Sequence, residues 1–131
     1  MIVVDASVLA NALADDGADG DLARERLREE QLVAPELVDL EVVSTLRRAA
    51  RAGRLKKARS EQALGDLAVL PLRRVPHLPL LSRVWELRDN LTAFDAAYIA
   101  LAEALDVLLL TADGPLAGAT GVRCQVEVLG G

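Results

Sequence analysis

The sequence predicts an α/β fold, a three-layer sandwich in which a central, mostly parallel sheet of four to five strands lies between helices. Short apolar runs within residues 1–5 (MIVVD) and 106–113 (DVLLLTAD) are typical of strands buried on both faces of a parallel sheet. Segments with apolar residues at helical spacing separate them, which favours βα units. With 131 residues, 52% of them hydrophobic, the chain has the size of one domain with one core. We therefore expect residues 1–131 to form a single domain.

The first half of the chain is expected to alternate between strands and helices. Residues 1–5 (MIVVD) predict a strand and residues 6–15 a helix. Asp21 can begin a second helix that continues to about Glu30, and residues 31–35 (QLVAP) predict a second strand. Pro35 marks the start of a long helix over about 36–52, which ends at Gly53 because glycine readily adopts the left-handed conformation at a helix C-terminus. A further helix is expected over about 55–67.

The second half repeats this alternation. Residues 69–76 (VLPLRRVP) are a strand candidate weakened by two prolines, and residues 78–89 predict a helix. Thr92 can cap a helix over 93–105, in which Tyr98, Leu101, Ala102 and Leu105 share a buried face. Residues 106–113 (DVLLLTAD) predict a buried strand and a polar turn, residues 115–117 a helical turn, and residues 123–129 a last strand.

The residue composition excludes several kinds of site. Cys124 is the only cysteine and His77 the only histidine, so an internal disulfide and a zinc site of several Cys or His ligands are excluded. His77 lies between two prolines and is interpreted as a loop or helix-start residue. Only three aromatic residues occur, which argues against a nucleic-acid interface dominated by base stacking.

Nothing in the sequence indicates a membrane segment. No run of 18 uncharged apolar residues occurs, and Asp5 interrupts the N-terminal apolar stretch before a signal peptide could form. We therefore expect a cytoplasmic protein.

The basic residues are unevenly distributed. The formal net charge of −5 argues against binding to nucleic acid by overall electrostatics. The segment from Arg47 to Arg59, however, carries seven of the fifteen basic residues and no acidic one. This basic segment could contact phosphates or an acidic partner, or it could be a solvated helix face.

Four acidic residues occupy positions where a site could form. Asp5 ends the first strand, and Asp113 comes just after the apolar strand in DVLLLTAD. Both are therefore expected at the carboxyl edge of the sheet, where ligands of such folds bind. Asp95 lies in the first turn of its helix, and Glu41 lies in an otherwise apolar helical stretch. Each also has a simpler explanation: the three aspartates could cap helices or turns, Asp95 in a capping box with Thr92, and Glu41 could face solvent.

If the four carboxylates meet, their charges require a cation. Two carboxylates about 5 Å apart repel by roughly 3 kcal/mol at an effective dielectric constant near 20. Oxygen ligands without nitrogen or sulfur favour Mg²⁺ or Mn²⁺, which suits phosphodiester hydrolysis without a histidine base. Ser7 and Thr111, each two residues from an aspartate, could orient carboxylates or water.

The segments VVDASVLANAL, APELVDLEVVSTLRR, RDNLTAFDAAYIALAEAL and LLLTAD together resemble the PIN-domain ribonucleases, specifically the VapC toxins of bacterial toxin–antitoxin pairs. The resemblance covers nearly the whole chain. It implies that Asp5, Glu41, Asp95 and Asp113 hold Mg²⁺ or Mn²⁺, with Asp5 and Asp95 foremost as direct ligands, and that Ser7, Asn11 and Thr111 support them.

The same resemblance implies the substrate and partners. Family members cleave RNA, often structured RNA such as tRNA, are blocked by a cognate VapB-type antitoxin, and commonly form homodimers. One feature of the present sequence stands out beside the four acids: the stiff Gly114–Pro115 turn after Asp113 could offset that carboxylate.

Two other function classes remain open on the residues alone. A phosphoacceptor signalling domain also places acids at strand ends around Mg²⁺, but it usually needs a lysine near the acceptor, and Lys56 and Lys57 are the only lysines. A non-catalytic module could instead use the acidic pocket to receive arginines from a partner. Phosphodonor labelling of Asp5 and calorimetry with Mg²⁺ distinguish these from hydrolysis.

Overall fold

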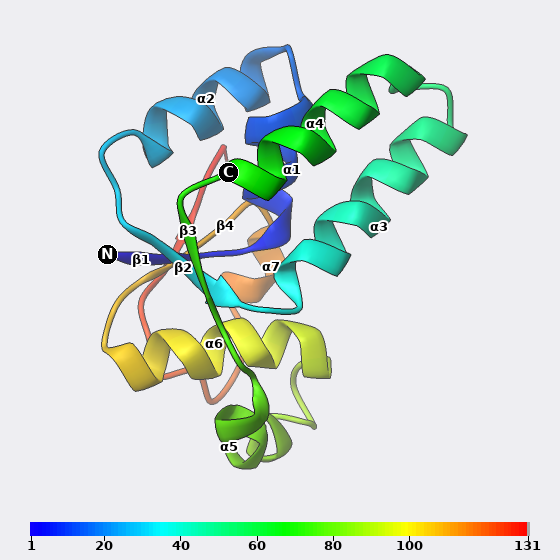
Figure 1. Ribbon diagram of the computed structural model, residues 1–131. Helices are drawn as coiled ribbons and strands as arrows, with labels where there is room; N and C mark the ends of the chain where they lie inside the picture. The colour runs from blue at the N-terminus through cyan, green and yellow to red at the C-terminus, as the bar shows by residue number, and fades with distance from the viewer. Residues whose placement is uncertain (131) are drawn as a thin grey trace.

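The computed structural model describes residues 1–130, in which five parallel strands form one sheet in the order β3-β2-β1-β4-β5 (Figure 1). The strands are β1 (Ile2–Val4), β2 (Leu32–Pro35), β3 (Leu72–Val75), β4 (Leu109–Thr111) and β5 (Val126–Val128). The predicted α/β class with a central parallel sheet is confirmed. Residue 131, the last of the expected domain, lies outside the described residues.

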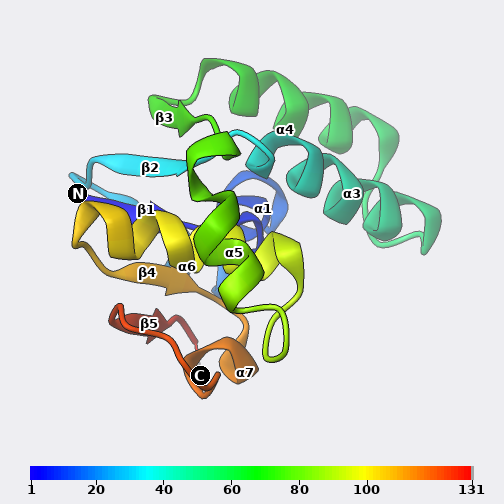
Figure 2. The same ribbon diagram turned by 90° about the horizontal axis from the view of Figure 1, so that it is seen from below.

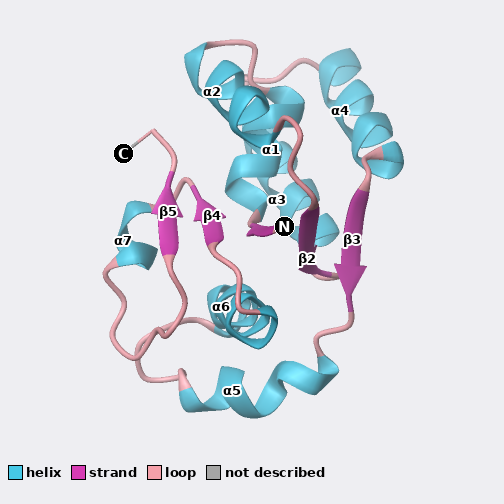
Figure 3. Cartoon of the chain, turned by 90° about the vertical axis from the view of Figure 1, so that its left-hand side faces the viewer, coloured by secondary structure: helices cyan, strands magenta, loops and turns pink. Residues whose placement is uncertain are grey.

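Helices cover both faces of this sheet. They are α1 (Ala6–Ala14), α2 (Ala18–Leu27), α3 (Val38–Arg51), α4 (Lys57–Val69), the 3₁₀ turn η1 (Leu78–Leu80), α5 (Leu81–Glu86), α6 (Ala93–Leu105) and α7 (Gly114–Ala117). Helices α5 and α6 lie on one side of the sheet, and α1, α2 and α4 on the other (Figure 3). Helices α3 and α4 pack side by side and extend away from the sheet (Figures 1 and 2).

The core explains why the predicted strands and the α6 helix are so apolar. All three residues of β1 are buried, as expected for a central strand covered on both faces. Residues 96–102 of α6 are buried without interruption, because α6 contacts the sheet on one side and α5 on the other. Tyr98, Leu101 and Ala102 are buried as predicted, whereas Leu105 is only partly buried.

Several element boundaries differ from the sequence prediction. Helix α2 begins at Ala18, three residues before Asp21, with Gly17 as its N-cap. Gly20 packs against the Asp15 carbonyl, where a Cβ atom would lie only 1.7 Å from the oxygen, so this position requires glycine. Pro35 ends β2 rather than starting a helix, and α3 begins at Val38. The predicted helix over 78–89 is divided into η1 and α5.

The proline-rich strand candidate is confirmed as β3. It lies at the edge of the sheet, and Pro71 and Pro76 flank the strand instead of interrupting its ladder, which is where prolines are tolerated. Within residues 1–130, no helix combines the length and apolar character needed to cross a membrane.

Candidate active site

The four acidic residues identified in the sequence line one cleft of about 650 Å³ at the carboxyl edge of the sheet. Each comes from a different place in the fold: Asp5 follows β1, Glu41 lies on α3, Asp95 on α6, and Asp113 between β4 and α7. Strands β1 and β4 are neighbours, while β1 leads on to β2 on its other side, so this is a topological switch point. The predicted convergence is therefore present; we call this cleft the acidic cleft.

Asp5 is held firmly at the end of β1. It is the N-cap of α1, with Oδ1 accepting from the backbone N–H groups of Ser7 (3.1 Å) and Val8 (3.3 Å) and from the Ser7 hydroxyl (2.5 Å). Burial, with only 7% of the residue exposed, raises the pKa of this carboxyl, and the hydrogen bonds oppose that rise. The capping explanation is thus correct, and the same side chain also lines the acidic cleft.

Two hydroxyl groups connect Asp5 to β4 and the turn after it. The Thr111 hydroxyl is fully buried and donates to Asp5 Oδ2, while it accepts from the Asp113 backbone N–H at 3.0 Å. The Ser7 hydroxyl accepts from Ala112 N–H at 3.0 Å. Thr111 therefore links Asp5 to the backbone of Asp113, and Ser7 links Asp5 to the backbone of Ala112; these are the two residues suggested by their spacing.

Glu41 faces the cleft rather than open solvent. Its Oε1 accepts a 2.6 Å hydrogen bond from the buried Tyr98 hydroxyl of α6. Burial raises the pKa of Glu41, and the charges of Asp95 and Asp5 add to this, while the Tyr98 hydrogen bond and the Arg48 charge oppose it. The sequence indicated Tyr98 only as a core residue, although its position three residues after Asp95 puts both on one face of α6.

Asp95 and Asp113 complete the group on the other side. The Thr92 hydroxyl caps α6 by accepting from Asp95 N–H at 3.2 Å, as predicted. Burial raises the pKa of the Asp95 carboxyl, and the charge of Asp113 raises it further. Asp113 is exposed and precedes α7 without a side-chain capping bond, so its carboxylate remains available to the cleft.

The acidic cleft has the donor chemistry of a site for a hard cation but is not a closed cage. Within residues 1–130, no three Asp, Glu, His or Cys side chains are close enough together to surround one ion. This arrangement fits Mg²⁺, which usually keeps several waters and takes only one or two carboxylates directly. Burial raises the pKa values of Asp5, Glu41 and Asp95, and neighbouring carboxylates add to this for Glu41 and Asp95, so a cation bound beside them would stabilise their charged forms.

The remaining candidates are distributed as follows. Asn11 lines the cleft, as does Arg48, the one basic residue among its lining residues. No lysine lines it, which argues against phosphoacceptor chemistry. His77 lies just before η1, with Nδ1 3.9 Å from Glu36 Oε1, and is not part of the cleft.

Comparison with known proteins identifies the family. Residues 2–119 match the family model for the PIN domain. The chain is 44% identical over 129 residues to the VapC ribonuclease Mb0985 of Mycobacterium bovis, covering 98% of each. The chain thus belongs to the PIN-domain family and, within it, to the VapC ribonucleases.

Solved structures share the fold at lower identity. The structure of VapC20 from Mycobacterium tuberculosis, a sarcin-ricin loop cleaving toxin, aligns with a TM-score of 0.70 at 18% identity, covering 94% of this chain and 97% of the other. A toxin–antitoxin complex from Klebsiella pneumoniae aligns with a TM-score of 0.63 at 19% identity, covering 98% and 97%. These likenesses support the fold assignment.

Proposed function

We propose that the protein is a divalent-metal-dependent endoribonuclease that hydrolyses RNA phosphodiester bonds at the acidic cleft. The observation that carries this proposal is the convergence of Asp5, Glu41, Asp95 and Asp113 from four separate elements into one cleft. RNA as the substrate is supported by the family, since the full-length relative is a ribonuclease. Structured RNA such as tRNA is a suitable class to test first.

Asp5 and Asp95 would hold Mg²⁺, or Mn²⁺ in its place, as direct ligands, and Glu41 and Asp113 would act on it through its bound waters. When bound, such an ion activates water near neutral pH and neutralises charge that develops on the phosphate. Ser7 and Thr111 orient the Asp5 carboxylate through their hydroxyl groups. Asn11, which lines the same cleft, is a further supporting residue.

The protein groups also supply acid–base chemistry. Burial and neighbouring charges raise the pKa values of Glu41 and Asp95. A carboxylate whose pKa is closer to neutral is a better acceptor for the proton that attacking water releases. The Tyr98 hydroxyl fixes Oε1 of Glu41 and leaves Oε2 for this role.

The proposed physiological role is that of a toxin in the cytoplasm, controlled by a VapB-type antitoxin. The shared fold with a toxin–antitoxin complex supports such a partner. A cationic side chain of the antitoxin could enter the acidic cleft in place of the metal, because the cleft has an excess of carboxylates over cations.

We also expect a homodimer. Large apolar side chains are exposed on α3 (Leu40, Val43) and on η1 and α5 (Leu78, Leu81, Trp85), and Leu40, Leu78 and Trp85 are each more than 60% exposed. Exposed apolar residues of this size are typical of interaction surfaces. Light scattering of the purified protein should give twice the mass of the 14.0 kDa chain.

The test of the proposed function is RNA cleavage with Mg²⁺ or with a chelator. The wild-type protein should cleave only with the metal, and Asp5→Asn and Asp95→Asn should each reduce the rate about 100-fold or more. Asp89→Asn is the control, because Asp89 is exposed and does not line the cleft. If both variants cleaved RNA in chelator as fast as the wild type does with Mg²⁺, the proposal would be overturned.

A further inference from the structure

A second cleft lies next to the acidic cleft and shares three of its lining residues. This cleft, of about 760 Å³, is lined by residues of α1, α3, the α3–α4 loop and α4, and we call it the basic cleft. Asn11, Thr45 and Arg48 line both clefts. A chain molecule bound over the carboxylates therefore needs to pass only these three residues to reach the basic cleft.

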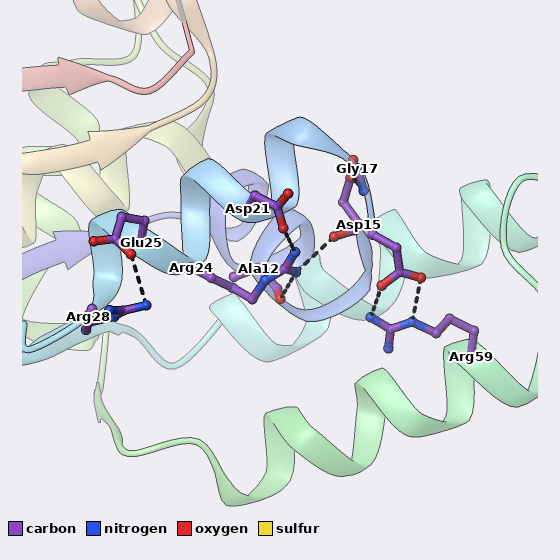
Figure 4. A network of polar contacts seen from close by, with 9 residues as sticks. Ala12, Asp15, Gly17, Asp21, Arg24, Glu25, Arg28 and Arg59 are labelled. Atoms are coloured by element: carbon purple, nitrogen blue, oxygen red, sulfur yellow. Dashed lines mark hydrogen bonds and ion pairs between the residues drawn. The ribbon is translucent and has the colours of Figure 1, made fainter.

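The basic cleft contains four of the seven cations in the basic segment of the sequence. Arg48, Arg54, Lys56 and Arg59 line it, against the two acids Asp15 and Asp16. Arg59 is already paired with Asp16, with Nη2 3.0 Å from Oδ1. In Figure 4, dashed lines mark the contacts of Arg59, which reaches from α4 toward the turn that carries Asp15 and Gly17. Asp15 Oδ1 accepts from Gly17 N–H at 2.7 Å.

The other three cations are available to a ligand. Within residues 1–130, Arg48, Arg54 and Lys56 form no salt bridge, and the Arg48 guanidinium makes one long hydrogen bond, 3.3 Å, to the Thr45 hydroxyl. Since the protein as a whole carries a charge of −5, a polyanion needs such a local group of cations to bind.

The arrangement on α3 sets the direction of binding. Glu41, Thr45 and Arg48 follow one another along the helix at spacings of four and three residues, which places them on one face. From Glu41 to Arg48 the rise along the helix axis is about 10 Å, at 1.5 Å per residue. Arg48 therefore lies about two helical turns beyond Glu41, at the part of the acidic cleft that it shares with the basic cleft, where its guanidinium can reach a phosphate next to the one under attack.

We propose that the basic cleft binds the RNA strand on one side of the cleaved bond, with Arg48 contacting the first phosphate outside the acidic cleft and Arg54 and Lys56 contacting phosphates beyond it. This inference rests on the proposed ribonuclease activity and adds to it the path of the substrate. Arg48 is then a positioning residue, and its contact is with the backbone, so it contributes affinity without sequence preference.

The test measures RNA binding separately from cleavage. In an Asp95→Asn background, which blocks cleavage, the affinity for a fluorescent single-stranded RNA is measured by anisotropy at several salt concentrations. Arg48→Gln should weaken binding about 5- to 10-fold near 0.1 M salt and reduce the slope of log affinity against log salt by about 0.7, the value for one phosphate contact of a single strand. Arg48→Lys should restore most of the slope, because it keeps the charge.

Arg47→Gln is the matched control. Arg47 is the neighbouring residue, carries the same charge and is exposed, but it lines neither cleft. The double variant Arg54→Gln/Lys56→Gln should reduce the slope of log affinity against log salt by about 1.4, the value for two phosphate contacts. In cleavage assays, which use protein with the native Asp95, Arg48→Gln should slow the cleavage of a long RNA more than that of a dinucleotide.

The possible outcomes separate the two proposals. If wild-type protein cleaves no RNA with Mg²⁺, the ribonuclease proposal fails. If it cleaves RNA but Arg48→Gln binds RNA like Arg47→Gln, only the present inference is overturned. It is also overturned if these substitutions leave RNA binding unchanged and weaken binding of polyglutamate instead, because the basic cleft would then serve an acidic protein segment.

Discussion

Replacing Thr111 with valine tests how the Asp5 carboxylate is held in the acidic cleft. Valine has nearly the shape of threonine, so it fills the fully buried position, but it cannot donate to Asp5 Oδ2 or accept from Asp113 N–H. A hydrogen bond to a charged group contributes about 1.5–3 kcal/mol. Asp113 is exposed and can bond to water instead, so we expect a total loss of about 2 kcal/mol in the free energy of unfolding.

This loss is large enough to measure in urea. With a denaturant slope of about 2 kcal/mol per M, the unfolding midpoint should fall by about 1 M, and the slope itself should not change. The control is Thr120→Val, at an exposed threonine whose backbone carbonyl, not its hydroxyl, accepts from Asn90. This control should change stability by less than about 0.5 kcal/mol.

The pH dependence of the Thr111→Val effect gives a second check. The Thr111 hydrogen bond lowers the pKa of Asp5 within a site where burial raises it, so its loss raises that pKa further. The stability difference between wild type and variant should therefore be largest at pH 7 and shrink as the pH falls through the Asp5 pKa. A variant within 0.5 kcal/mol of wild type at pH 7, or a difference independent of pH, would show that Thr111 does not hold the ionised carboxylate.

Three further predictions concern the charged side chains Glu41, Asp95 and Glu103. Tyr98→Phe keeps the buried ring but removes the 2.6 Å bond to Glu41, so we expect a loss of about 1.5 kcal/mol at pH 7 by urea unfolding. Asp95→Asn should stabilise the metal-free protein at pH 7 by about 1 kcal/mol, measured by thermal unfolding with chelator. Because the pKa of Asp95 is higher in the folded protein, ionisation of Asp95 lowers the stability of the wild type as the pH rises from about 3.8, the ordinary Asp pKa, through the folded pKa. The stability gain of the variant should therefore vanish below about pH 3.8. Glu103→Gln weakens the 2.7 Å pair with Arg83. Burial alone would raise the pKa of Glu103, but the hydrogen bond from Arg83 lowers it. The variant should therefore lose about 1 kcal/mol in the free energy of unfolding above pH 4.5, and this loss should disappear as the pH falls through the lowered pKa.

The sheet and the positions of Asp5 and Asp113 could be predicted because their signals are local. A buried parallel strand is recognisable from its own apolar residues, and an acid directly after it must lie at the carboxyl edge. The Thr92 cap follows from residues only three positions apart. Such features depend on short-range spacing, which a single sequence displays directly.

Features that depend on packing between distant segments could not be predicted. Tyr98 was expected only in the core, yet its hydroxyl meets Glu41, 57 residues away, because α3 and α6 approach each other at the cleft. Likewise the basic segment gives no sign of which cations face α1. That distinction depends on how α3 and α4 pack, and on Asp16 pairing with Arg59 rather than another arginine.

The most direct test of the central claim is Mg²⁺ binding measured by calorimetry on the wild type and on Asp5→Asn, Glu41→Gln, Asp95→Asn and Asp113→Asn, with Asp89→Asn as control. If the four carboxylates act as one cation-holding centre, each of the four variants should bind Mg²⁺ about tenfold or more weakly, and the control should match the wild type. Unchanged Mg²⁺ affinity in all four variants would contradict the account.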